Sequence, residues 1–166
     1  MDNMENMDFE AKRLKQADEL MQLLNERRMK ELQLRLEDMN EFDVAEFLSE
    51  IGDNRMPMVF RLLSKETAAD VFANFDSPEQ EQIINSITDS ELSAIIEELY
   101  VDDAVDMMEE LPANVVKRVM RTATPETRRL INQYLNYPEN SAGSIMTAEF
   151  VDLKKYMNVR ESIARI

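Results

Sequence analysis

The sequence predicts an all-α protein, a superhelix or solenoid of short stacked helices that follows a longer N-terminal helical segment. Three observations support this fold. The 166 residues include only 2 Gly and 5 Pro, and helix-favouring residues dominate the rest. Apolar residues recur with a period of about twelve through most of the chain. Residues that favour helix starts stand between the repeated blocks.

Residues 1–39 form the first predicted unit, with a helix over about residues 8–37. One apolar stripe runs from Leu14 to Leu24 and a second from Met29 to Met39. The step of five residues between the stripes shifts the apolar face by about a third of a turn, so we expect a break near Asn25. Neither stripe fills three heptads, so packing on the next helices is favoured over a coiled-coil dimer.

Residues 40–136 form the second unit, an acidic helical repeat. Each block places an apolar residue after an apolar pair that lies four and three positions earlier, which is one face of a helix. Helices of about two turns need neighbours to cover that face, so we expect stacked helical hairpins. The pair in the last block is degraded by Asn132. The repeated residues are Ile51, Leu63, Phe75, Ile87, Leu99, Leu111, Ala123 and Leu135.

Capping residues mark where the helices of this unit begin. Pro directly follows Ser77 and Thr124, which is typical of the first helical position. Thr88 is followed three residues later by Glu91, as in a capping box. The expected N-caps are Asn40, Ser64, Ser77, Thr88 and Thr124.

The repeat stops at Leu135, and two further segments follow. Residues 137–147 contain Pro138 and Gly143 and are predicted to be a junction linker. Residues 148–166 are expected to be the truncated start of another domain. Within them residues 149–153 alternate like a short strand, and a helix is expected to start at Asn158.

Composition excludes several functions. With no Cys and no His the chain cannot form a structural zinc site, a disulfide, a thiol nucleophile or an imidazole base. The net charge of −15 argues against nucleic acid as a partner. No apolar run is long enough to cross a membrane, so no membrane contact by this part of the protein is expected. No arrangement of residues predicts an enzyme.

The charge is concentrated in one stretch. Between Glu66 and Asn114 there are 14 acidic residues and no Lys or Arg, so this stretch carries almost all of the net charge of −15. Acidic residues often only keep a surface soluble. A long stretch without a compensating base also attracts cations, because binding a cation relieves the repulsion between like charges.

The best candidate for a metal site in this stretch is Asp102-Asp103-Ala104-Val105-Asp106. Asp102 and Asp106 are four residues apart, so their carboxylates project from one helical face. Mg²⁺ prefers oxygen ligands, keeps several waters and commonly uses one or two carboxylates. Asp103 points away from that face and is a weaker candidate. The alternative is that these aspartates only interact with the dipole of the helix that they open.

The junction Tyr137-Pro138-Glu139-Asn140-Ser141-Ala142-Gly143-Ser144-Ile145-Met146-Thr147 resembles that of the MgtE family of bacterial magnesium transporters, where a helical N domain meets the first CBS domain. The acidic blocks that contain Glu97-Glu98-Leu99 and Glu109-Glu110-Leu111 are also similar to that N domain. The resemblance covers about residues 36–166.

The resemblance implies the cytosolic N domain and the start of a CBS domain, in a homodimer at the cytoplasmic face of the cell membrane. Its partners would be the CBS domains and the membrane domain of the same full-length chain. Mg²⁺ bound between the N and CBS domains would favour the closed pore. The family's pair of magnesium-binding aspartates corresponds to Asp102 and Asp106. The alternative function is an acidic helical-repeat scaffold that docks a basic protein partner.

Overall fold

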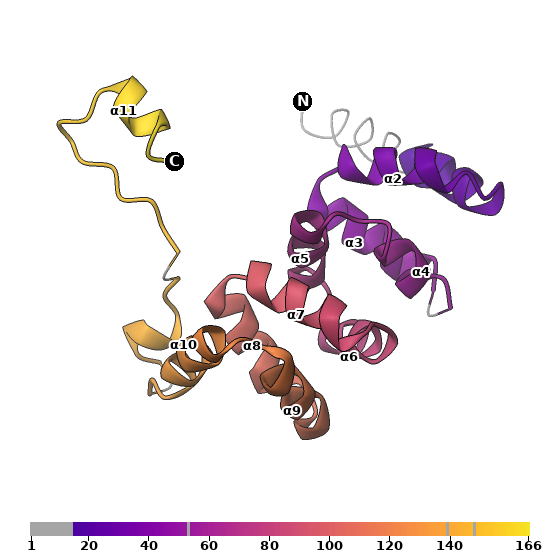
Figure 1. Ribbon diagram of the computed structural model, residues 1–166. Coiled ribbons are helices and arrows are strands. Elements are labelled where there is room, and N and C mark those ends of the chain that lie inside the picture. The colour runs from indigo at the N-terminus through magenta and orange to yellow at the C-terminus, as the bar shows by residue number, and fades with distance from the viewer. Residues whose placement is uncertain (1–14, 53, 139, 148) are drawn as a thin grey trace, which may run out of the picture.

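A computed structural model describes residues 15–52, 54–138, 140–147 and 149–166, and every regular element within these residues is helical, which confirms the all-α prediction. The first helix covers residues 15–25. In Figure 1 the helices follow one another in a curved array, and the last segment leads away from it. The later helices are α2 (Met29–Glu37), α3 (Glu41–Glu50), α4 (Met56–Phe60), α5 (Lys65–Ala73), α6 (Ser77–Ser86), α7 (Asp89–Glu98), α8 (Val101–Glu110), α9 (Ala113–Thr122), α10 (Pro125–Leu135) and α11 (Val159–Ile163).

The twelve-residue period sets the spacing of the helices. α5 begins at residue 65, and α6, α7, α8, α9 and α10 begin at residues 77, 89, 101, 113 and 125. Helices two apart in the chain pack on each other, so α3, α5, α7 and α9 form one stacked series. α4 packs on α6, and α8 packs on α10. This stacking is the predicted superhelix.

The repeated apolar pairs form the core of the array. Both members are buried in every block from Phe47 and Leu48 to Met107 and Met108. In the last block Ile131 is fully buried, whereas Asn132 faces solvent. Leu135 is 39% exposed, so the core ends where the sequence pattern ends.

The predicted break in the N-terminal segment is confirmed. The helix over residues 15–25 ends in a left-handed residue, Arg27, at φ 59°. The backbone N–H of Arg28 donates to the carbonyl of Leu23 at 3.0 Å, and that of Arg27 donates to Leu24 at 3.2 Å. These two bonds form a Schellman motif, which satisfies the last carbonyls of the helix and turns the chain into α2. The predicted part of this helix before residue 15 lies outside the described residues.

α4 is the exception to the period. It has five residues and begins at Met56, three positions later than the period predicts. The chain first turns at Gly52, whose φ of 79° is in the region that favours glycine. Pro57 then lies in the first turn of α4. The N–H groups of a first turn have no partner within the helix, so the lack of an N–H in Pro57 costs no hydrogen bond. The delayed start therefore follows from local turn chemistry that periodicity does not report.

Four of the five predicted N-caps are confirmed, since the side chains of Asn40, Ser64, Thr88 and Thr124 each accept a bond from a first-turn N–H. The prediction of Ser77 was wrong, because Asp76 caps α6 instead. The Asp76 carboxylate accepts from the N–H of Glu79 at 3.1 Å, and the Glu79 carboxylate accepts from the N–H of Asp76 at 3.1 Å. Asp76 can be the N-cap because Pro78, which then lies at the second position of α6, is also tolerated in the first turn of a helix.

The segment after α10 is mostly irregular. A 3₁₀ turn, η1 (Ala142–Ser144), lies against α10. The helix expected to start at Asn158 is present as α11, for which Asn158 is the N-cap. The predicted strand over residues 149–153 was wrong, because these residues have no regular structure. Alternating side chains form a strand only when a neighbouring strand supplies backbone hydrogen bonds. No described helix is long and apolar enough to cross a membrane.

Candidate cation-binding site

α8 separates its apolar and acidic side chains onto two faces. The buried face consists of Val101, Ala104, Val105, Met107 and Met108 and packs on α10. The acidic side chains therefore remain outside the core. The N-cap residue, Tyr100, supplies no side-chain bond to the first turn of α8, so groups from elsewhere must satisfy its free N–H groups.

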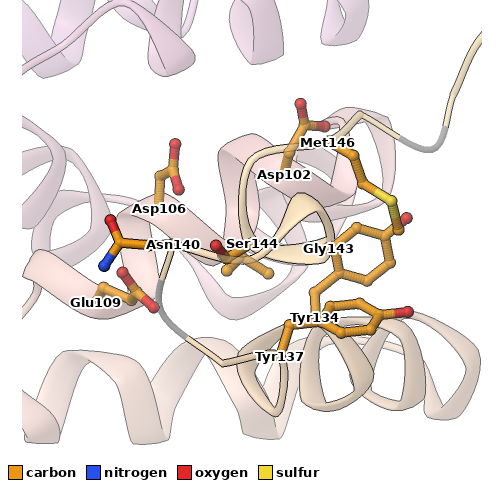
Figure 2. Close-up of a pocket in the computed structure, with 10 residues that line it drawn as sticks. Asp102, Asp106, Glu109, Tyr134, Tyr137, Asn140, Gly143, Ser144 and Met146 are labelled. Carbon is orange, nitrogen blue, oxygen red and sulfur yellow. The ribbon is translucent and has the colours of Figure 1, made fainter.

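Three carboxylates of α8 line one pocket, as Figure 2 shows for Asp102, Asp106 and Glu109. They are four and three residues apart and therefore share a helical face. The pocket has a volume of about 170 Å³. The structure thus brings together Asp102 and Asp106, as their spacing predicts, and adds Glu109. The other lining residues are Val105, Tyr134, Tyr137, Asn140, Gly143, Ser144 and Met146.

Asp103 lies outside this pocket, and its half-buried side chain is in a different environment. Partial burial raises the pKa of its carboxyl, and the negative charges of Asp102, Asp106, Asp70 and Glu149 raise it further. Asp70 belongs to α5 and has a raised pKa as well, caused by burial and by the charges of Glu41 and Glu66. The first turn of α8 therefore lies in a field of negative charge from several parts of the chain.

The opposite wall of the pocket is held by an aromatic contact. Tyr134 and Tyr137 meet edge to face, with 5.6 Å between ring centroids. Gly143 lies so close to the Tyr137 ring that a Cβ atom there would be 2.6 Å from Cγ and Cδ1 of the ring. Only glycine fits this contact, which fixes the junction segment against α10.

The last residue of the junction, Thr147, and Glu149 just beyond it reach back to the first turn of α8. The Thr147 hydroxyl donates to Oδ1 of Asp102 at 3.3 Å, and the N–H of Val101 donates to Oε1 of Glu149 at 3.4 Å. Burial raises the pKa of the Tyr134 hydroxyl, and the charges of Glu149 and Asp102 raise it further. Sequence reasoning missed Thr147 and Glu149, because they lie 45 and 48 residues from their partners.

The chemistry of these groups suits a hydrated Mg²⁺ ion. Within the described residues no ion pair involves Asp102, Asp103 or Asp106. No three carboxylates of the described chain converge into a complete metal shell. Mg²⁺ does not need one, since it commonly retains several waters and takes one or two carboxylates. Asp102 and Asp106 are the residues that could hold it.

Comparison with known proteins identifies the helical array. The family model of the MgtE intracellular N domain matches residues 39–140. The magnesium transporter MgtE of Thermus thermophilus is 30% identical over 151 residues, which are 89% of this chain and 33% of the relative. That of Bacillus subtilis is 16% identical over 144 residues, covering 87% of this chain and 32% of the relative. The chain thus spans about a third of the length of these relatives.

Two solved structures have the same fold. The soluble part of a magnesium transporter matches with a TM-score of 0.78 and 22% identity, over 92% of this chain and 60% of that one. The cytosolic domain of the Mg²⁺ channel MgtE, solved in complex with ATP, matches with a TM-score of 0.72 and 29% identity, over 89% of this chain and 61% of that one.

Proposed function

The chain belongs to the MgtE family through its intracellular N domain, and we propose that it is the Mg²⁺-sensing regulatory part of a magnesium transporter. The observation that supports this role is the group of Asp102, Asp106 and Glu109 on one face of α8, beside the junction segment. The site binds and releases an ion, and no catalytic role is proposed for it.

The proposed mechanism starts from repulsion. Without a divalent ion, the carboxylates of α8 repel other negative groups that approach this face. Mg²⁺ held by Asp102 and Asp106 removes that repulsion, so a second acidic surface can pack against α8. We propose that this surface belongs to the CBS domains of the same full-length protein, in a homodimer, and that the packed arrangement favours the closed pore. The ion selects this arrangement only through its higher affinity for it.

Thermal unfolding of the 166-residue chain tests the ion site. Mg²⁺ bound to the folded chain stabilises it by RT ln(1 + [Mg²⁺]/Kd), which is about 1.4 kcal/mol at ten times Kd. For a chain of this size that corresponds to a rise in Tm of about 3–6 °C. The reference is NaCl at equal ionic strength. We expect Asp102→Asn/Asp106→Asn to abolish the additional rise caused by Mg²⁺.

The matched control is Glu50→Gln/Glu98→Gln, which removes the same charge at two exposed positions on α3 and α7. The control should retain the response to Mg²⁺. The ion site is refuted if the wild type responds equally to Mg²⁺ and NaCl. That result would favour the alternative function, an acidic scaffold whose basic protein partner dissociates with monovalent salt and is insensitive to chelator.

A further inference from the structure

We infer that Tyr137 and Gly143 form a latch that fixes the direction in which the chain leaves the helical array. Both are positioning residues, since the ring of Tyr137 holds the turn that contains Gly143, and this turn places the residues that follow it. The latch concerns the connection between the array and the chain beyond it, so the inference does not depend on the cation site.

The ring of Tyr137 attaches the turn to the core of the array. Tyr137 is half-buried against the apolar core, and its ring meets that of the buried Tyr134 edge to face, with 5.6 Å between centroids. Figure 2 shows Gly143 beside the Tyr137 ring. A Cβ atom on Gly143 would lie 2.6 Å from Cγ and Cδ1 of the ring and 2.9 Å from Cδ2, so the backbone there lies against the ring face. Because Cγ moves only by rotation about χ1, a larger residue would force the ring away from Tyr134.

The turn that the ring holds is ordered by its own hydrogen bonds. The N–H of Ser141 donates to the carbonyl of Pro138 at 3.1 Å. The N–H of Ser144 donates to the hydroxyl oxygen of Ser141 at 3.3 Å, and the Ser144 hydroxyl donates to the carbonyl of Ser141 at 3.0 Å. Asn140 turns the chain with a φ of 61°, a left-handed conformation that Asn adopts more readily than most residues. Residues 140–147 are therefore one unit, and a contact at one point fixes the whole turn.

A second attachment lies at the far end of the turn. The Thr147 hydroxyl donates to Oδ1 of Asp102 on α8 at 3.3 Å. Because α8 and α10 pack on each other, the turn is joined to both helices of one packed pair. A closed latch therefore passes the position of this pair to the chain that follows, and an open latch does not.

The latch can open without unfolding the array. Most of the side chains in residues 140–147 are exposed, and few hydrogen bonds hold the turn besides the ring contact. Segments with few buried contacts and exposed hydrogen bonds open locally at low cost in free energy. Residues 149–153 have no regular structure that would hold the chain in place once the latch opens. The contact between Tyr137 and Gly143 thus decides whether the chain leaves the array in one direction or in many.

Distance measurements between two spin labels test the latch. The chain has no Cys, so labels attach only at introduced cysteines. Suitable positions are Lys117→Cys on α9 and Ile145→Cys in the turn, because both side chains are exposed. Measurement without divalent cations keeps the result independent of Mg²⁺ binding. We expect one narrow distance distribution when the rest of the sequence is unchanged.

Gly143→Ala should broaden this distribution. Overpacking by one methyl group shifts a local equilibrium toward the open form by a factor of about 5–150. The matched control is Ala142→Ser, which adds one heavy atom at the neighbouring exposed position of the same turn. The control should keep the narrow distribution. Circular dichroism should show the same helix content in every variant, because the latch lies outside the core of the array.

Two changes of Tyr137 separate the latch from a general loss of stability. Tyr137→Phe loses only the hydroxyl that accepts from Gln133 at 3.4 Å, so it should keep the narrow distribution. Tyr137→Ala removes the ring and should broaden it. Since Tyr137 and Gly143 act through one contact, Gly143→Ala/Tyr137→Ala should be no broader than Tyr137→Ala alone.

Several results would overturn the inference. One is a broad distribution before any latch residue is changed, and another is a narrow one in Gly143→Ala or Tyr137→Ala. Equal broadening in Ala142→Ser, additive broadening in the double variant, or a loss of helix content in Gly143→Ala would overturn it as well.

Discussion

Replacing Asp103 by Asn should stabilise the protein at neutral pH when no divalent cation is present. Burial and four neighbouring acids raise the pKa of Asp103 in the folded state. Its position in the first turn of α8 has the opposite effect, because a helix N-terminus favours a negative charge. Since the pKa is raised overall, burial and repulsion outweigh the dipole. The charged carboxylate therefore costs folding free energy.

The pH dependence follows from the sign of this shift. A carboxyl with a raised pKa binds its proton more tightly in the folded state, so its contribution to stability falls as the pH rises through that pKa. Above its folded-state pKa Asp103 is charged in both states and the penalty is complete. As the pH falls through its folded pKa the penalty disappears. The advantage of Asp103→Asn should therefore be greatest near neutrality and shrink in acid.

The magnitude is small because the side chain is only half-buried. Like charges one turn apart on a helix destabilise it by about 0.2–0.5 kcal/mol per pair. With solvent screening of the more distant acids, we expect a gain of about 0.5–1 kcal/mol, or about 1–4 °C in Tm at pH 7. Saturating Mg²⁺ should reduce the difference in Tm between Asp103→Asn and the wild type, because the ion removes part of the same repulsion from the wild type.

Thermal unfolding monitored by circular dichroism at pH 7 and pH 4 measures this effect. Glu126→Gln is the matched control. Glu126 is an exposed acid in the first turn of α10, near Arg128 and Arg129. Removing its charge should leave Tm unchanged or lower it slightly. An Asp103→Asn protein with the same Tm as the wild type at pH 7, or with an advantage that persists at pH 4, would refute the reasoning.

Three other substitutions test separate features of the fold. Gly143→Ala places a methyl group 2.6 Å from the Tyr137 ring. It should cost about 1–3 kcal/mol in chemical denaturation and weaken Mg²⁺ binding by displacing the junction segment. Arg118→Lys should cost about 1–3 kcal/mol in the same assay, because its guanidinium bonds at once to two carbonyls at the end of α6 and to Asp89. Arg27→Gly should raise Tm by about 2–4 °C, since Arg27 has a φ of 59° that glycine adopts without strain.

The helical array was the most predictable part of the structure. Burial in this array repeats every twelve residues, and the apolar residues record that repeat directly. Two local predictions failed, the N-cap of α6 and the start of α4, for different reasons. Asp76 and Ser77 are both good N-caps and are adjacent, so the sequence alone cannot select one. Gly52 and Pro57 delay α4 through turn geometry that an apolar pattern does not report.

The candidate site was predictable only in part. Asp102 and Asp106 are related by the geometry of one helix, so their spacing places them together before any tertiary structure is known. Asp70 and Glu149 reach the same region from other segments, by packing of α5 and by the path of the chain after α10. Contacts over such distances in the sequence leave no periodic signal. The prediction of a strand over residues 149–153 failed for a similar reason, since a local pattern does not determine whether a strand has a pairing partner.

The acidic residues between Glu66 and Asn114 do not form a uniform solvated surface, and this supports the proposal of a cation site on α8. Arginines from other segments pair with acids on α7: Arg61 contacts Glu91, and both Arg118 and Arg121 contact Asp89. Basic side chains thus reach into the stretch where neighbouring helices bring them. None of those described pairs with the aspartates of α8. Three acids of α8, Asp102, Asp106 and Glu109, line one pocket at the junction, where binding a cation would affect the chain that follows.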